Sequence, residues 1–147
     1  MKALLSKNHL LLLIAFISML TVPTACREEV DEVAEKQARV WEYSKQHPAG
    51  FTININDWTT PTEGICVSYG ETQSSHDYGG LSKVIVHALA HDGYVGGWLD
   101  TTSGFYYFDS SRLFPENELE AAKAFGKENG QKAIYVISCD STIYITN

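Results

Sequence analysis

The stretch between residues 81 and 114 constrains the fold more strongly than any other part of the sequence. Its first part repeats apolar side chains at helical spacing, at Leu81, Val84, Ile85, Ala88 and Leu89. Gly93 is suited to end this helix because glycine adopts the left-handed conformation without strain. Two aromatic-rich segments, 94–99 and 105–108, flank the turn residues 100–104, which is the pattern of a β-hairpin. The sequence therefore predicts a helix packed on an antiparallel strand pair, with Trp98 as an anchor of the core.

The flanking segments extend this unit into a mixed domain. Strand-like alternation or β-branched composition recurs at residues 51–55, 65–69, 132–139 and 142–145, and a second helix is expected after Pro115. Because the order lacks the regular strand–helix alternation of a parallel sheet, we expect an α+β domain over residues 50–147. It should contain a mainly antiparallel sheet of about five to six strands with two packed helices. Residues 70–80 are polar and flanked by glycines, which predicts a loop long enough to be functional.

The amino terminus has the order of a secretory signal peptide over residues 1–25: a positive start, an apolar run and a small-residue end. Cys26 follows, and residues 22–26 resemble a bacterial lipobox, although Pro23 occupies a position where a small or β-branched residue is usual. We expect acylation of Cys26, so that acyl chains hold the mature protein on a membrane. An ordinary secreted protein is the alternative. The charged residues 26–49 are predicted to form a helical tether, with a disordered stalk as the alternative.

Charge and the residues after Cys26 bear on location and partners. Residues 1–25 contain Lys2, Lys7 and no acid, so their removal changes the net charge from −7 to −9. An acidic body repels phosphate backbones, and nucleic acid is therefore not an expected partner. Arg27, Glu28 and Glu29 resemble the export signals that send lipoproteins to the outer membrane and the cell surface. A domain facing the periplasm is the alternative. The sequence allows a protein partner and specifies none.

The two remaining cysteines, Cys66 and Cys139, form an even pair in an oxidising compartment. They could form a disulfide or remain two separate buried thiols. Both alternatives stay open, because the distance between the two Cα atoms depends on how the strands pair.

Several polar residues are candidates for chemistry. His87 and His91 are four residues apart on the predicted helix, a spacing that can ligate zinc, but no third ligand has a recognisable spacing. We expect no metal and no cofactor. Along the second aromatic strand, Ser110 and Arg112 share one face. Asp109 and Ser111 share the other face. Arg112 could bind an anion or pair with a nearby acid. The candidate binding surface consists of His76, Asp77, Tyr78, His87, His91 and Arg112.

Three segments carry a resemblance to a known family: GFTI at residues 50–53, VGGWLD…YYFDSSRLF between residues 95 and 114, and AFGKENGQKAIYVI at residues 124–137. Together they resemble an uncharacterised family of small domains found in short lipoproteins of gut Gram-negative anaerobes. More divergent members occur in the tails of phage head-associated proteins. The resemblance implies no activity. Its phage setting suggests, by analogy, a relation to barnase-like toxin nucleases, whose His, Glu and Arg pattern does not map onto this sequence.

Two functions follow as hypotheses. The first is a membrane-anchored lipoprotein with a non-catalytic interaction or accessory domain. It rests on the predicted lipidation signal, the acidic net charge and the absence of a decisive catalytic motif in the sequence. The alternative is a nuclease-like or other hydrolase domain that uses His76, His91 and Arg112 around the loop at residues 70–80. That alternative requires the three side chains to converge in one cleft.

Overall fold

The computed structural model describes the backbone of residues 24–145 and the side chains of residues 28–145. The predicted signal peptide, apart from its last two residues, and the side chain of Cys26 lie outside the described residues. The described residues divide into two units, one that includes residues 24–32 and one, compact, that includes residues 33–145. Among the helices of residues 24–145, none has the length and apolar composition needed to cross a membrane.

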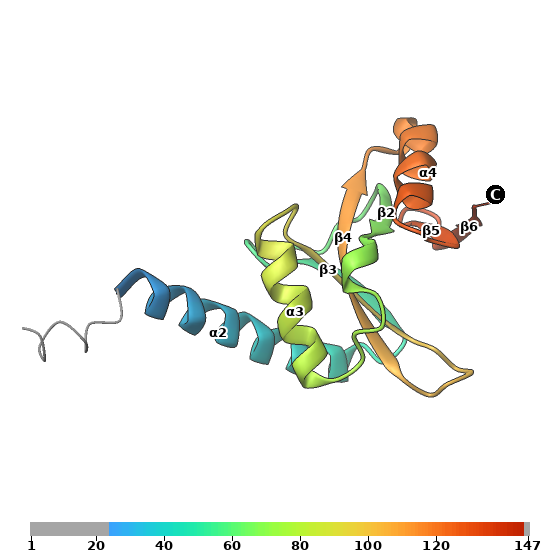
Figure 1. Ribbon diagram of the computed structural model, residues 1–147. Coiled ribbons are helices and arrows are strands. Elements are labelled where there is room, and N and C mark those ends of the chain that lie inside the picture. The colour runs from blue at the N-terminus through green and yellow to red at the C-terminus, as the bar shows by residue number, and fades with distance from the viewer. Residues whose placement is uncertain (1–23, 146–147) are drawn as a thin grey trace, which may run out of the picture. The chain divides into compact units, whose positions relative to one another are not determined.

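Within the described residues, six strands form one sheet in the spatial order β1-β3-β4-β2-β5-β6, and every neighbouring pair is antiparallel (Figure 1). The strands are β1 (Gly50–Asn54), β2 (Ile65–Ser68), β3 (Tyr94–Leu99), β4 (Tyr106–Phe114), β5 (Ala133–Val136) and β6 (Ser141–Tyr144). The helices are α2 (Thr24–Gln46), α3 (Tyr78–Leu89) and α4 (Leu119–Glu128). This arrangement confirms the predicted α+β class, and the predicted hairpin is the pair β3–β4.

Helix α3 begins at Tyr78, before the predicted start at Leu81. Asp77 caps it, because its carboxylate accepts a hydrogen bond from the backbone N–H of Gly80 at 2.5 Å. The predicted loop at residues 70–80 is shorter as a result, and its first residues form a 3₁₀ turn, η1 (Gly70–Thr72). Gly93 adopts the predicted left-handed conformation, with a φ of 77°. Helix α3 itself ends earlier, at Leu89, so the prediction that Gly93 ends the helix is wrong in position.

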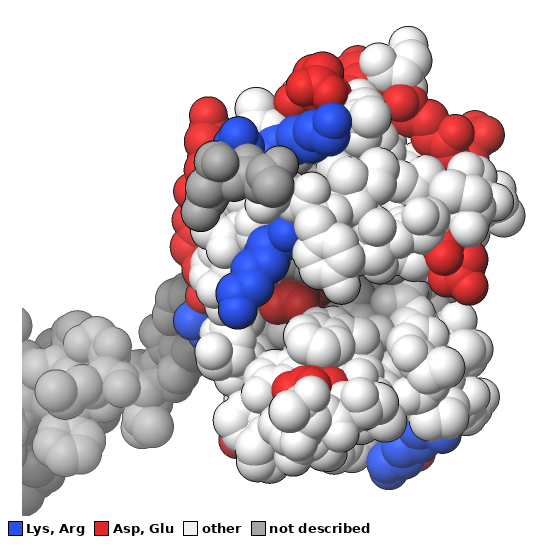
Figure 2. All heavy atoms as spheres, turned by 90° about the vertical axis from the view of Figure 1, so that its right-hand side faces the viewer, with Lys and Arg blue, Asp and Glu red and all other residues white. Residues whose placement is uncertain are grey.

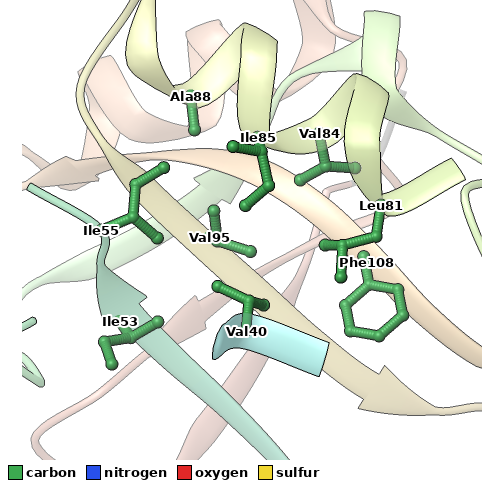
Figure 3. Packing of buried hydrophobic residues seen from close by; sticks show 9 residues of the cluster. All are labelled: Val40, Ile53, Ile55, Leu81, Val84, Ile85, Ala88, Val95 and Phe108. Atoms are coloured by element: carbon green, nitrogen blue, oxygen red, sulfur yellow. The ribbon is translucent and has the colours of Figure 1, made fainter. Parts of the chain in front are cut away.

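One hydrophobic cluster lies between helices α2 and α3 and strands β1, β3 and β4 (Figure 3). Its buried members are Val40, Ile53, Ile55, Leu81, Val84, Ile85, Ala88, Val95 and Phe108. Val40 belongs to the segment predicted as a tether, yet the compact second unit begins at Val33 and Val40 is fully buried in it. Phe108 is the largest fully buried side chain among the described residues. Trp98 is 47% exposed, so the prediction that it anchors the core is wrong.

A second cluster lies beneath α4 and contains Ile65, Val67, Phe114, Ala122 and Ile134. Both clusters occupy the same face of the sheet. The register pairs Val95 with Ser110, and strand side chains alternate between faces, so Phe108 and Phe114 point the same way as Val95. From Val33 onward, the helices therefore cover one face of the sheet. The Trp98 side chain points to the opposite face.

Candidate functional site

The face of the sheet opposite the helices is hollowed into a groove of about 1000 Å³, which we call the sheet groove. All six strands line it, from Thr52 on β1 to Thr142 and Tyr144 on β6. Figure 2 shows the molecular surface hollowed between an upper and a lower part, with acidic atoms in the hollow. The groove is therefore a surface that the sheet builds with its uncovered side chains.

Asp109 lies inside β4 and faces the sheet groove. Its Oδ2 accepts a hydrogen bond from Trp98 Nε1 at 3.2 Å, and the Trp98 ring stacks on Tyr107 with centroids 5.1 Å apart. Burial raises the pKa of Asp109 to about 6, because removal from water disfavours the charged form of a carboxyl group. The groove thus places a poorly solvated carboxylate beside an aromatic platform.

Hydroxyl and thiol groups continue the groove floor next to Asp109. Ser111 Oγ lies 3.4 Å from Ser68 Oγ, and Thr52 Oγ1 donates to Cys66 Sγ at 3.9 Å. Burial raises the pKa of the Cys66 thiol, which keeps it protonated. Because the thiolate is the reactive form of cysteine, Cys66 is not an activated nucleophile. The floor offers hydrogen-bonding groups to a ligand.

The two consecutive glycines of β3, Gly96 and Gly97, differ in how much space surrounds them. A Cβ at Gly97 would overlap the ring of Phe51 and come within 2.8 Å of the ring of Tyr106. Packing therefore requires glycine at position 97. Gly96 pairs with Asp109 and faces the groove, and a Cβ there would approach no atom closer than Ser111 Oγ at 3.6 Å. Packing does not require glycine at 96, and its missing side chain keeps the groove floor open.

The predicted histidine pair lies on the helix side of the sheet. The rings of His87 and His91 stack with centroids 3.9 Å apart, and both contact Tyr69. His87 Nδ1 lies 3.0 Å from the hydroxyl oxygen of Ser110, which is fully buried. Burial, together with the neighbouring His91, lowers the pKa of His87. Among the described residues, no group of three His, Cys, Asp or Glu side chains is arranged to hold a metal ion.

The residues of the nuclease alternative are divided between the two faces of the sheet. The Arg112 guanidinium lies over the rings of Phe114 and Phe125, at 4.8 and 5.5 Å from their centroids, on the helix side. His76 instead contacts Tyr107, which lines the groove. His91 is on the helix side with His87. The structure therefore does not bring His76, His91 and Arg112 into one cleft.

The other predicted site residues have structural partners. Asp77 caps α3, and the Tyr78 ring packs edge-to-face on Trp41 at 5.4 Å. The six residues proposed as a binding surface therefore do not form one surface. Asp77 caps α3, Tyr78 packs on Trp41, and His76 contacts the β3–β4 hairpin. The other three lie on the helix side of the sheet. The structure contains Cys66 and Cys139 as free thiols, the first buried and the second exposed.

Sequence reasoning missed the groove residues Gly96, Trp98, Tyr107 and Asp109 as a site. The alternation along β4 was visible, and it placed Asp109 on the face opposite Arg112. The sequence did not indicate which of the two faces the helices would leave open.

No protein-family model, curated protein or solved structure gives a match to this chain. The role of the sheet groove must therefore follow from its own side chains.

Proposed function

We propose that the protein is a membrane-anchored, non-catalytic binding module that holds its ligand in the sheet groove. The observation that supports this most strongly is the pair Gly96 and Asp109 on the groove floor. A glycine inside a strand gives up side-chain packing and β-propensity, and here packing does not require it. A carboxyl group with a raised pKa lowers the stability of the folded protein at neutral pH. Ionisable groups whose pKa is strongly shifted by burial concentrate at functional sites.

The proposal includes the cellular location that the amino-terminal sequence predicts. Acyl chains on Cys26 hold the protein on the outer membrane, and the domain faces outward. The resemblance to lipoproteins of gut Gram-negative anaerobes supports this part of the proposal. A module at this position captures its ligand at the membrane surface. A nuclease-like activity is not proposed, because His76 and Arg112 lie on opposite faces of the sheet.

Photo-crosslinking in intact cells tests the groove. A benzoylphenylalanine at Tyr144, which lines the groove rim and is 78% exposed, should give a crosslinked adduct on irradiation. The same group at Val86, exposed on α3, is the matched control and should give none. A Gly96→Val change fills the groove floor and should abolish the Tyr144 adduct. Equal adducts from Tyr144 and Val86, or an adduct that Gly96→Val leaves unchanged, would contradict groove binding.

Acyl labelling tests the anchor. Cells that produce the parent protein should incorporate a labelled fatty acid into it, and a Cys26→Ala variant should lose both the label and membrane association. Protease added to intact cells should then remove the domain of the parent protein. A domain cleaved only after the outer membrane is opened would place it in the periplasm. A Cys26→Ala variant that keeps the acyl label would contradict the lipid anchor.

A further inference from the structure

We infer that the ligand of the sheet groove is a basic peptide segment, an extended chain that places a lysine or arginine side chain against Asp109 and the Trp98–Tyr107 platform. The inference rests on the proposed function and specifies the chemistry of its ligand. It stands on the charge of the groove, the aromatic surface beside Asp109 and the length of the groove.

The charges of the groove favour a cation. Its lining contains three carboxylates, Asp100, Asp109 and Asp140, and one ammonium group, on Lys132. Asp100 accepts hydrogen bonds within its own turn, and Asp140 accepts one from Tyr135. Asp109 accepts one hydrogen bond from within the described residues, at Oδ2, although a carboxylate can accept about four. Its other oxygen can therefore receive donors from a ligand, and a cationic donor also supplies the opposite charge that a poorly solvated carboxylate lacks.

The aromatic surface suits the same ligand. Trp98 remains 47% exposed although it stacks on Tyr107, so part of its surface is open to a ligand. An ammonium or guanidinium group is attracted to the face of such a ring, and tryptophan is the strongest partner. The aliphatic part of a lysine or arginine side chain packs on aromatic carbon while its charged end reaches the carboxylate. A neutral sugar could stack on the same rings, but it would leave Asp109 without a counter-charge.

The length of the groove distinguishes a peptide from a small amine. The groove crosses six strands, and five strand spacings of about 4.8 Å give about 24 Å. An extended chain of about seven residues, at about 3.4 Å each, covers that distance. The hydroxyl groups of Thr52, Ser68 and Ser111 lie along the floor and can bond to the backbone of such a chain.

Titration followed by NMR tests the inference on the full-length protein in a non-ionic detergent. The signal of the Trp98 indole N–H, assigned from its loss in a Trp98→Phe variant, reports binding beside Asp109. The indole signals of Trp41 and Trp58 report that each variant is folded. Acetyl-hexalysine amide should shift the Trp98 signal saturably. The same peptide with acetylated side chains, acetyl-hexaglutamate amide and a neutral hexasaccharide should not.

The variants assign the effect to the groove. Asp109→Asn should weaken hexalysine binding by about tenfold or more, since it removes one charge-assisted contact. Glu120→Gln removes the same charge from an exposed position on α4 and should leave the affinity unchanged. Spermine, a cation without a peptide backbone, should bind at least about tenfold more weakly than the peptide, because it makes none of the backbone contacts.

The outcomes separate this inference from the proposed function. An acetylated peptide or hexasaccharide that binds as tightly as hexalysine would overturn the basic ligand and leave groove binding intact. Equal affinities of the parent and Asp109→Asn, or equal losses in Asp109→Asn and Glu120→Gln, would also overturn it. Spermine that equals the peptide would overturn the peptide part. Groove binding, and with it the proposed function, is contradicted by the crosslinking results: equal adducts from Tyr144 and Val86, or a Tyr144 adduct that Gly96→Val leaves unchanged.

Discussion

Replacing Asp109 with asparagine is expected to stabilise the protein at neutral pH and to have little effect near pH 4. The pKa of Asp109 is raised from 3.8 to about 6, so the folded protein binds this proton more tightly than the unfolded chain does. Asp109 therefore does not destabilise the fold at low pH, where its carboxyl group is protonated in both states. The unfolding free energy falls as the pH rises from about 4 to about 6 and this group ionises. A shift of about two pKa units corresponds to about 3 kcal/mol, at 1.36 kcal/mol for each unit. Asparagine removes this penalty and still offers an oxygen to Trp98 Nε1.

Urea unfolding of the parent and Asp109→Asn at several pH values measures the difference in unfolding free energy. The difference should grow from near zero at about pH 4 to about 3 kcal/mol above about pH 7. Asp100→Asn is the control of opposite sign, because hydrogen bonds from Ser103 and Thr102 lower the pKa of Asp100. That variant should lose stability at neutral pH. Equal unfolding free energies of Asp109→Asn and the parent at neutral pH would refute the reasoning, as would a gain of the same size at low pH.

Three further experiments test the burial and packing of individual side chains. Phe108→Ala should lower the unfolding free energy by about 3–5 kcal/mol because it empties a buried site, whereas Trp98→Ala should lower it much less; equal shifts of the denaturant midpoint would contradict this ranking. In the native protein without reductant, a thiol reagent should modify exposed Cys139 and reach Cys66 only after unfolding, as measured by intact mass; no modification even after unfolding would reveal a disulfide. Gly97→Ala should cost about 1–3 kcal/mol through overpacking, read from thermal unfolding, and an unchanged midpoint would show that the neighbouring rings can move.

The parts of the fold that the sequence predicts are those governed by local rules. The apolar stripe of α3, the left-handed Gly93 in the turn after it and the β3–β4 hairpin depend on residues close to one another in the chain. The role of α2 was less accessible, because Val40 is buried by strands that follow it in the sequence. An aromatic residue gives no local sign of its exposure either. Trp98 has the composition of a core residue, and only its register opposite Tyr107 places it on the uncovered face.

The candidate site was harder to predict because the two faces of β4 look alike in sequence. The helix face carries Phe108 but also Ser110 and Arg112, and the groove face carries Tyr107 and Asp109. Each face thus combines an aromatic ring with a charge, so hydrophobicity does not identify the buried one. The polar residues of the helix face are accommodated by contacts from distant elements, such as the one between Ser110 and the α3 histidine. Those contacts exist only once the helices are in place.

The position of β4 within the sheet suits Asp109 to the binding role that we propose for it, although its carboxylate is destabilising. β4 pairs with β3 on one side and with β2 on the other, so strands hold its backbone on both edges. Phe108 and Phe114 fix its helix face in the two hydrophobic clusters. Such a strand holds Asp109 in one place before any ligand arrives, and a ligand need not order it. The desolvation of Asp109 is imposed when the protein folds, so a cation that enters the groove gains the full attraction of a preformed carboxylate without that cost at the binding step.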